Sequence, residues 1–204
     1  MLKLGLTGSI ATGKSTALDA FAALGVPVFS SDAAVHELYA GAAVPVVEKL
    51  FPGTTGPEGV DRAKLSAALL SAPTRLAELE AAVHPMVRER IAAFLDAAES
   101  KGAALAVVDI PLLFETGFDY GLDAVVVTAC RPETQRRRAL ARPGMSVGKL
   151  EAILARQLPQ EAKIQRADYV IDTDQPIEAV RKTVAALVGT LRRDIGKPRP
   201  IGKP

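Results

Sequence analysis

The stretch Gly8-Ser-Ile-Ala-Thr-Gly13-Lys14-Ser15 decides the fold, because it matches the pattern G-x-x-x-x-G-K-[ST]. Glycines at both ends of the loop let the backbone curl so that successive N–H groups point inward at an anion. In such a loop the lysine reaches the β- and γ-phosphates of a nucleotide, and the hydroxyl after it ligates Mg²⁺. The expected nucleotide-binding residues are Gly8, Ser9, Ile10, Ala11, Thr12, Gly13, Lys14, Ser15 and Thr16.

The surroundings of the loop predict the fold class. An apolar run over residues 2–6 precedes it, a helical stretch over residues 15–24 follows it, and further apolar runs cover residues 26–29, 103–109, 123–128 and 169–172. Runs that are apolar on both faces are typical of parallel strands covered by helices, and the helical stretches between them fit right-handed crossovers. We therefore predict a single α/β domain over residues 1–194 with a doubly wound parallel sheet, its core formed by residues 1–32, 102–130 and 167–194.

Two segments are longer than a crossover requires. Residues from about 33 to 101 look almost wholly helical, hold no convincing strand, and are divided by prolines into several short helices. Residues from about 131 to 166 are rich in Arg and Gln and predict two exposed helices joined by a turn at Pro143-Gly144. We expect the first segment to be an inserted helical subdomain that binds an acceptor, the second to be a helical lid, and residues 195–204 to be a flexible basic tail.

Composition excludes several classes of function. The 204 residues carry 25 basic and 23 acidic side chains, aromatic residues make up 4%, and Trp is absent, which argues against a nucleic-acid partner. The single cysteine excludes an intramolecular disulfide framework or a cysteine-cage metal site. No apolar run reaches the ~20 residues that span a bilayer, and the N-terminus has no signal-peptide layout. We expect a cytoplasmic protein without a membrane partner, as a monomer or small homo-oligomer.

A phosphate loop is shared by GTPases, motor ATPases and small-molecule kinases. The chain has no N-K-x-D tetrapeptide to read guanine, and the strand that ends at Asp109 lacks the adjacent Glu typical of motor ATPases. A helical insertion that holds an acceptor and an Arg-rich lid that excludes water are what a kinase needs. The pattern therefore favours a P-loop kinase type of sheet. A nucleotide-binding regulatory module without catalysis remains the alternative from another class.

Two acidic residues follow predicted strands, where ligands bind in open α/β sheets. Asp32 is a candidate for contact with the acceptor, although it could instead cap the next helix, as could Ser30 and Ser31. Asp109 is a candidate ligand of Mg²⁺ or of the acceptor.

Basic residues complete the candidate site. Arg138 and Arg142 lie four apart in the lid and are candidates for contact with the transferred phosphate, although a charge run is commonly a solvated face. His84 precedes a proline, so a turn residue explains it equally well.

Over residues 1–191 the chain resembles the dephospho-coenzyme A kinase family. The Pro-Leu-Leu-Phe-Glu string that ends at Glu115 and the Glu80-to-His84-Pro85 spacing are more discriminating than the phosphate loop. The other landmarks are the phosphate loop, Ser31-Asp32, Val60-Asp61-Arg62, Gln157 with the lid arginines, and the run from Ala167 to Asp172. Two segments depart from the family pattern. Ser9, Ala11 and Thr12 replace residues of a loop that usually reads Gly-Gly-Ile-Gly-Ser-Gly, and Thr173 replaces the usual Asn.

The resemblance implies phosphorylation of the ribose 3′-hydroxyl of dephospho-coenzyme A by ATP, with Mg²⁺ as cofactor. It implies that Asp32 handles the attacking hydroxyl, that Lys14 and Ser15-bound Mg²⁺ act at the ATP phosphates, and that the lid supplies Arg138 and Arg142. His84 and Arg88 are implied toward the acceptor. Another small-molecule kinase, such as a nucleoside or nucleotide kinase, is the alternative of the same class.

Overall fold

The computed structural model describes residues 1–194, so the predicted flexible tail over residues 195–204 lies outside the described residues. The chain divides into two compact units. The first joins Met1–Phe29 to the described residues from Leu95 onward, and the second comprises Ser30–Phe94. None of the helices in the described part is long and apolar enough to cross a membrane.

A five-stranded sheet forms the centre of the first unit. Its strands are β1 (Leu2–Gly8), β2 (Val28–Ser30), β5 (Leu105–Asp109), β6 (Ala124–Ala129) and β7 (Tyr169–Asp172), in the spatial order β2-β5-β1-β6-β7. The central strand β1 pairs in parallel with β5 on one side and with β6 on the other, and β6 pairs in parallel with β7. This order confirms the predicted α/β doubly wound sheet.

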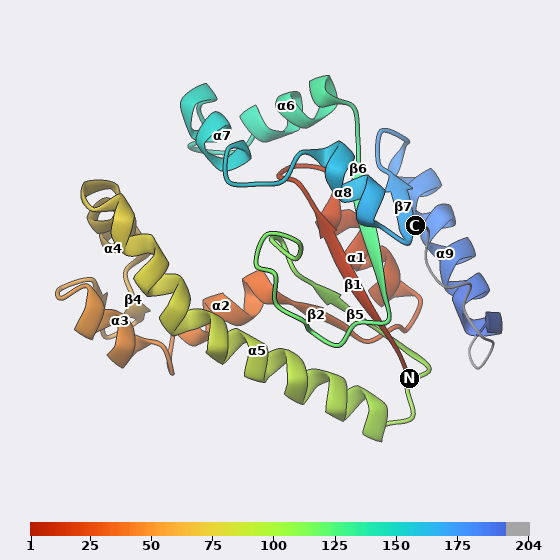
Figure 1. Cartoon of the computed structure of the whole chain (residues 1–204), viewed down its shortest axis with the longest axis horizontal. Coiled ribbons are helices and arrows are strands. Elements are labelled where there is room, and N and C mark those ends of the chain that lie inside the picture. Colours follow the sequence, from red (N-terminus) through yellow and green to blue (C-terminus); the bar gives the residue numbers. More distant parts are fainter. Residues whose placement is uncertain (195–204) are drawn as a thin grey trace. The chain divides into compact units, whose positions relative to one another are not determined.

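Two helices cover this sheet and build its core. They are α1 (Lys14–Ala23), directly after the phosphate loop, and α9 (Ile177–Asp194), and they pack against each other. Their buried side chains join strand residues in one cluster, in which Leu4, Leu6, Phe21, Val126 and Val184 are almost completely inaccessible to solvent. This core anchors β1 through Leu4 and Leu6, and the carboxyl end of β1 leads through the phosphate loop into α1 (Figure 1).

The second unit contains α2 (Ser31–Tyr39), α3 (Val44–Leu50), α4 (Arg62–Ser71), the 3₁₀ helix η1 (Pro73–Arg75) and most of α5 (Leu76–Ser100). The prediction that this segment holds no strand was wrong in one detail, because β3 (Thr55–Gly56) and β4 (Gly59–Val60) form a short antiparallel hairpin. Gly59 is required there, since its φ is +103° and a Cβ atom would lie 2.3 Å from the Tyr39 carbonyl oxygen.

Some prolines mark helix boundaries in this unit, but two that were expected to divide helices do not: Pro57 lies in the turn between β3 and β4, and Pro85 lies inside a helix. Pro45 lies in the first turn of α3 and Pro73 begins η1, where a missing N–H costs little. Pro85, in contrast, lies inside the 25-residue helix α5 and does not end it, so the prediction of a break at this proline was wrong. Pro85 cannot donate to the carbonyl of Ala81, but Ala81 is exposed, so this carbonyl does not require a donor from the protein.

The lid segment contains three helices rather than the two that were predicted: α6 (Pro132–Leu140), α7 (Val147–Leu154) and α8 (Gln160–Arg166). The extra break lies between Leu154, the last residue of α7, and Gln160, and Pro159 is the N-cap of the new helix. Lys163 of α8 is completely buried and forms an ion pair of 2.7 Å with Glu115, whose carboxylate also accepts a hydrogen bond from the Leu158 N–H. In Figure 1 α6 and α7 lie beyond the carboxyl end of β1.

Candidate active site

The phosphate loop connects β1 to α1, and two of its glycines are required by its geometry. A Cβ atom on Gly8 would lie 2.3 Å from the Thr128 hydroxyl oxygen and 2.6 Å from that of Thr12. Gly13 has a φ of +81° and its Cα faces Thr173, whose side chain would lie 3.0 Å from an added Cβ. Both glycines therefore allow other parts of the sheet to approach the loop closely.

Hydrogen bonds of three buried threonines, one within the loop and two outside it, stabilise the conformation of the loop. The Thr12 hydroxyl donates to the Ser9 carbonyl oxygen (2.8 Å) and lies 2.9 Å from the hydroxyl of Thr128, at the end of β6. The Thr173 hydroxyl, in the turn after β7, donates to the Thr12 carbonyl oxygen at 2.8 Å. The role of Thr128 in supporting the loop was not predicted from the sequence. The signal that could have indicated it is a polar residue at the end of an apolar strand.

Lys14 forms an ion pair with Asp109, at the end of the neighbouring strand β5. The Lys14 side chain is 14% exposed and the Asp109 side chain 5%. The pair therefore satisfies a buried carboxylate, in addition to the role at the phosphates that the loop pattern predicts for Lys14.

The residues at this position fit a magnesium ion that is shared with nucleotide phosphates. Ser15 is exposed at the start of α1, and the Asp109 carboxylate adjoins the loop through Lys14. Mg²⁺ is commonly held by one or two carboxylate or hydroxyl ligands together with substrate phosphates and water, rather than by a complete protein cage. Among residues 1–194 there is no cluster of three or more His, Cys, Asp or Glu side chains suited to a metal ion.

The lid contacts the tip of the phosphate loop directly. Gln135 of α6 donates to the Ile10 carbonyl oxygen, and the side-chain oxygen of Gln157, in the turn before α8, accepts from the Ile10 N–H; both distances are 2.9 Å. The next residue, Ala11, has a φ of +62°, and its methyl group is buried in a cluster with Ala139 and Leu150 of the lid. Gln135 was missed by the sequence analysis, since a polar side chain in a charged helix carries no distinguishing pattern.

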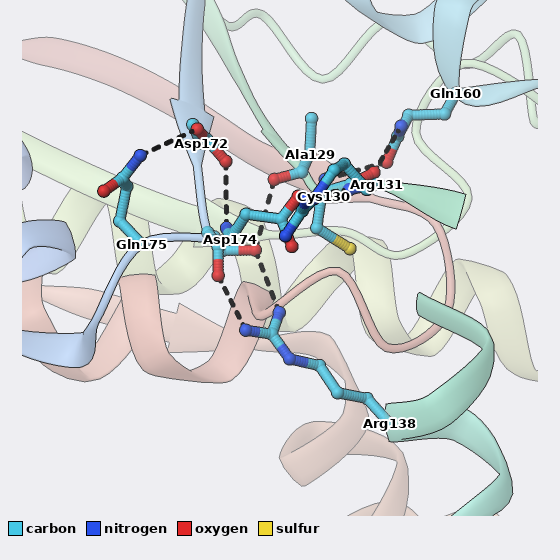
Figure 2. A network of polar contacts seen from close by, with 9 residues as sticks. Ala129, Cys130, Arg131, Arg138, Gln160, Asp172, Asp174 and Gln175 are labelled. Carbon is cyan, nitrogen blue, oxygen red and sulfur yellow. Dashed lines mark hydrogen bonds and ion pairs between the residues drawn. The ribbon is translucent and has the colours of Figure 1, made fainter. Parts of the chain in front are cut away.

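The two lid arginines differ in their surroundings. Figure 2 shows Arg138 reaching from α6 to the segment after β7, where it donates to the carbonyl oxygen of Thr173 (2.6 Å) and to its hydroxyl (3.2 Å). Arg142 is exposed and lies beyond the end of α6, after the cap residue Ala141. The two arginines therefore do not share one helix, although both belong to the lid.

Asp174 links the start of the lid to the end of β7 (Figure 2). Its carboxylate accepts from the backbone N–H of Arg131 at 2.6 Å and pairs with the Arg131 side chain at 3.0 Å. A hydrogen bond from the Thr134 hydroxyl, followed by those from Arg131, lowers the pKa of Asp174 below its ordinary value. The adjacent Cys130 is buried, and this burial raises the pKa of its thiol. Burial thus disfavours the thiolate, the reactive form of the Cys130 side chain.

Three predicted acceptor residues, Asp32, His84 and Arg88, lie in the second unit. Asp32 is exposed in the first turn of α2, and the cap of this helix is Ser30, whose hydroxyl oxygen accepts from the Ala33 N–H. Capping therefore does not require Asp32. His84 and Arg88 are half-buried and one turn apart on α5, so they share one face of that helix.

Comparison with known proteins identifies the family. The family model of dephospho-CoA kinase matches residues 2–179. The dephospho-CoA kinase of Rhodopseudomonas palustris is 53% identical over 188 residues, which cover 92% of this chain and 94% of the relative. That of Mesorhizobium japonicum is 53% identical over 196 residues, covering 96% of this chain and 100% of the relative. The chain belongs to the dephospho-CoA kinase family.

Solved structures agree with this membership. The crystal structure of TT1252 from Thermus thermophilus superposes with a TM-score of 0.78 at 33% identity, covering 93% of this chain and 97% of that one. The dephospho-CoA kinase from Campylobacter jejuni has a TM-score of 0.66 at 23% identity, with 93% and 96% coverage, which shows the shared fold. As a member of this family the chain is a nucleotide-binding transferase of the kinase class.

Proposed function

We propose that this protein transfers the γ-phosphoryl group of ATP to the ribose 3′-hydroxyl of dephospho-coenzyme A, which gives coenzyme A and ADP in the last step of coenzyme A biosynthesis. The observation that carries the proposal is the Lys14 ammonium, held by Asp109 at a phosphate loop whose shape is supported from three strands, in a chain of this family. In the transfer, the 3′-oxygen forms a bond to the γ-phosphorus while the bond from that phosphorus to the β–γ bridging oxygen breaks. ADP leaves with that electron pair.

Positioning and charge neutralisation supply most of the catalysis in phosphoryl transfer. The inward N–H groups of the loop and the N-terminus of α1 bind the phosphates, and Lys14 neutralises charge on the β- and γ-oxygens. Asp32 accepts the proton of the attacking hydroxyl. Ser15 and Asp109 are the residues that would hold Mg²⁺, which when bound neutralises phosphate charge and orients the triphosphate.

Two lid arginines and a helix of the second unit complete the proposed machinery. Arg138 and Arg142 contribute positive charge toward the transferring phosphoryl group, and the lid excludes water from it. His84 and Arg88 contribute a donor and a positive charge to acceptor binding from α5. Small molecules, ATP and dephospho-coenzyme A, are therefore the proposed partners.

A panel of acceptors tests the function. The purified protein is incubated with ATP and Mg²⁺ and with adenosine, AMP or dephospho-coenzyme A, and ADP release is followed with a coupled assay while mass spectrometry identifies the product. We expect ADP release only with dephospho-coenzyme A, and phosphorus NMR of the product to place the new phosphate on the 3′-oxygen. Product from adenosine or AMP instead would contradict the acceptor assignment. If the protein binds ATP but releases no ADP in the presence of any of the acceptors, it is a nucleotide-binding module without catalysis.

A further inference from the structure

The peptide group of Ile10, at the tip of the phosphate loop, is held on both sides by the lid. Its N–H donates to the Gln157 side-chain oxygen and its carbonyl accepts from the Gln135 side-chain nitrogen, each at 2.9 Å. A backbone N–H only donates and a backbone carbonyl only accepts, so the two carboxamides are fixed in opposite senses. The contacts join residues separated by 147 and 125 positions in the sequence.

A second observation, at the neighbouring residue, also joins the loop tip to the lid. Ala11 has a φ of +62°, in the left-handed region that a residue with a Cβ atom rarely adopts. Its side chain is only 7% exposed, because the methyl group packs against Ala139 of α6 and Leu150 of α7. A strained backbone of this kind persists only where its surroundings over-determine it.

From these contacts we infer that Gln135 and Gln157 are positioning residues for phosphoryl transfer: they fix the tip of the phosphate loop through the Ile10 peptide. In this role they do not contact the reacting atoms. They hold the loop in the conformation in which its N–H groups bind phosphate. Their hydrogen bonds also connect the lid directly to the tip of the loop. The inference rests on the proposed function, because its kinetic readout is the transfer from ATP to dephospho-coenzyme A.

Two isosteric substitutions distinguish the effect of losing a hydrogen bond to Ile10 from the effect of adding a negative charge to the lid. Gln157→Glu keeps an oxygen that accepts from the Ile10 N–H, whereas Gln135→Glu removes the nitrogen that donates to the Ile10 carbonyl. Both variants add one negative charge to the lid beside the loop, so a general repulsion of ATP affects both. Gln165→Glu, at an exposed position of α8, is the control for added charge on the lid.

The measurements are kcat and KM for both substrates, together with hydrogen exchange of a peptide that covers residues 9–16 in the protein without nucleotide. For Gln135→Glu we expect kcat at saturating ATP to fall about tenfold, the consequence of about 1.4 kcal/mol, with faster exchange of the loop peptide and KM for dephospho-coenzyme A within about twofold of the parent. Gln157→Glu and Gln165→Glu should retain kcat within about threefold and exchange at the parent rate. Gln157→Leu, which removes the acceptor without adding charge, should match Gln135→Glu.

The outcomes distinguish this inference from the proposed function. A parent protein that forms no ADP with dephospho-coenzyme A would overturn the proposed function. If the parent is active but Gln135→Glu and Gln157→Leu keep its kcat and loop exchange rate, the two glutamines are not positioning residues. Equal losses in Gln135→Glu and Gln157→Glu would also overturn the inference, since added charge and not the hydrogen bond would then be responsible.

Discussion

The ion pair between Lys14 and Asp109 leads to a prediction about stability as well as about catalysis. Lys14→Met removes the ammonium but keeps most of the apolar stem, so it leaves the buried Asp109 carboxylate without its lysine. Removing one partner of a buried pair commonly costs 3–5 kcal/mol. Because the lysine retains some exposure, we expect a loss of about 3 kcal/mol in the free energy of unfolding. At about 2–4 °C per kcal/mol, the melting temperature should fall by roughly 6–12 °C.

The double variant Lys14→Met/Asp109→Asn separates the two roles of the lysine. The double variant also removes the buried negative charge that Lys14 paired with, so at least half of the lost stability should return. Transfer should be abolished in both variants, because the loop lacks its phosphate-binding charge. Urea unfolding at neutral pH and the coupled ADP assay measure the two quantities on the same samples. A Lys14→Met protein with the parent's unfolding free energy would refute the structural role of the pair. Recovery of activity in the double variant would refute the catalytic role.

The remaining predictions concern the acid, the lid and pH. Asp32→Asn should leave ATP binding intact and lower kcat by about 10²–10⁴-fold, as measured by steady-state kinetics; activity within a few-fold of the parent would exclude a role as base. Arg138→Ala and Arg142→Ala should each lower kcat, by up to about 10³-fold, more than acceptor affinity, and only Arg138→Ala should also lower the melting temperature, because Arg138 bonds to the β7 segment. If both keep the parent's kcat, the lid arginines are not catalytic. The lowered pKa of Asp174 contributes stability that is present above its ordinary value of 3.8 and is lost as pH falls through the lower folded value, so urea unfolding should show a shallower loss of stability below about pH 4 in Asp174→Asn than in the parent. A parallel loss in both proteins would contradict this.

Local sequence signals predicted the backbone of the central sheet well. The late strand was predicted over residues 169–172 and is observed as Tyr169–Asp172, and the helix after the phosphate loop was predicted to within one residue at each end. The wrong predictions of helix boundaries concern prolines, whose effect depends on their place in the helix. Pro85 lies inside α5 without ending it, and Ala81, whose carbonyl it leaves without a donor, is exposed; Pro159 is the N-cap of a lid helix that was not predicted.

Side-chain partners could not be predicted in the same way. Glu115 was recognised as part of a string of residues, but its burial beside Lys163 requires the lid to fold back onto the segment after β5. Serine at position 30 was one of three possible caps, and only the backbone of α2 distinguishes it from its neighbours. Ordinary polar residues such as Gln135 become informative only when their contacts are known.

The sequence by itself determined the phosphate loop, the parallel strands around it and the membership in a kinase family, because these depend on short patterns of glycine, charge and apolar residues that act on the nearby backbone. Only the tertiary structure decided that Lys14 pairs with Asp109 and that lid glutamines hold the tip of the loop. These contacts join residues separated by 95 to 147 positions, and such residues meet only after the order of the strands in the sheet has brought their ends together. No local pattern encodes that order, which depends on how the helices cover the sheet and which apolar surfaces they bury.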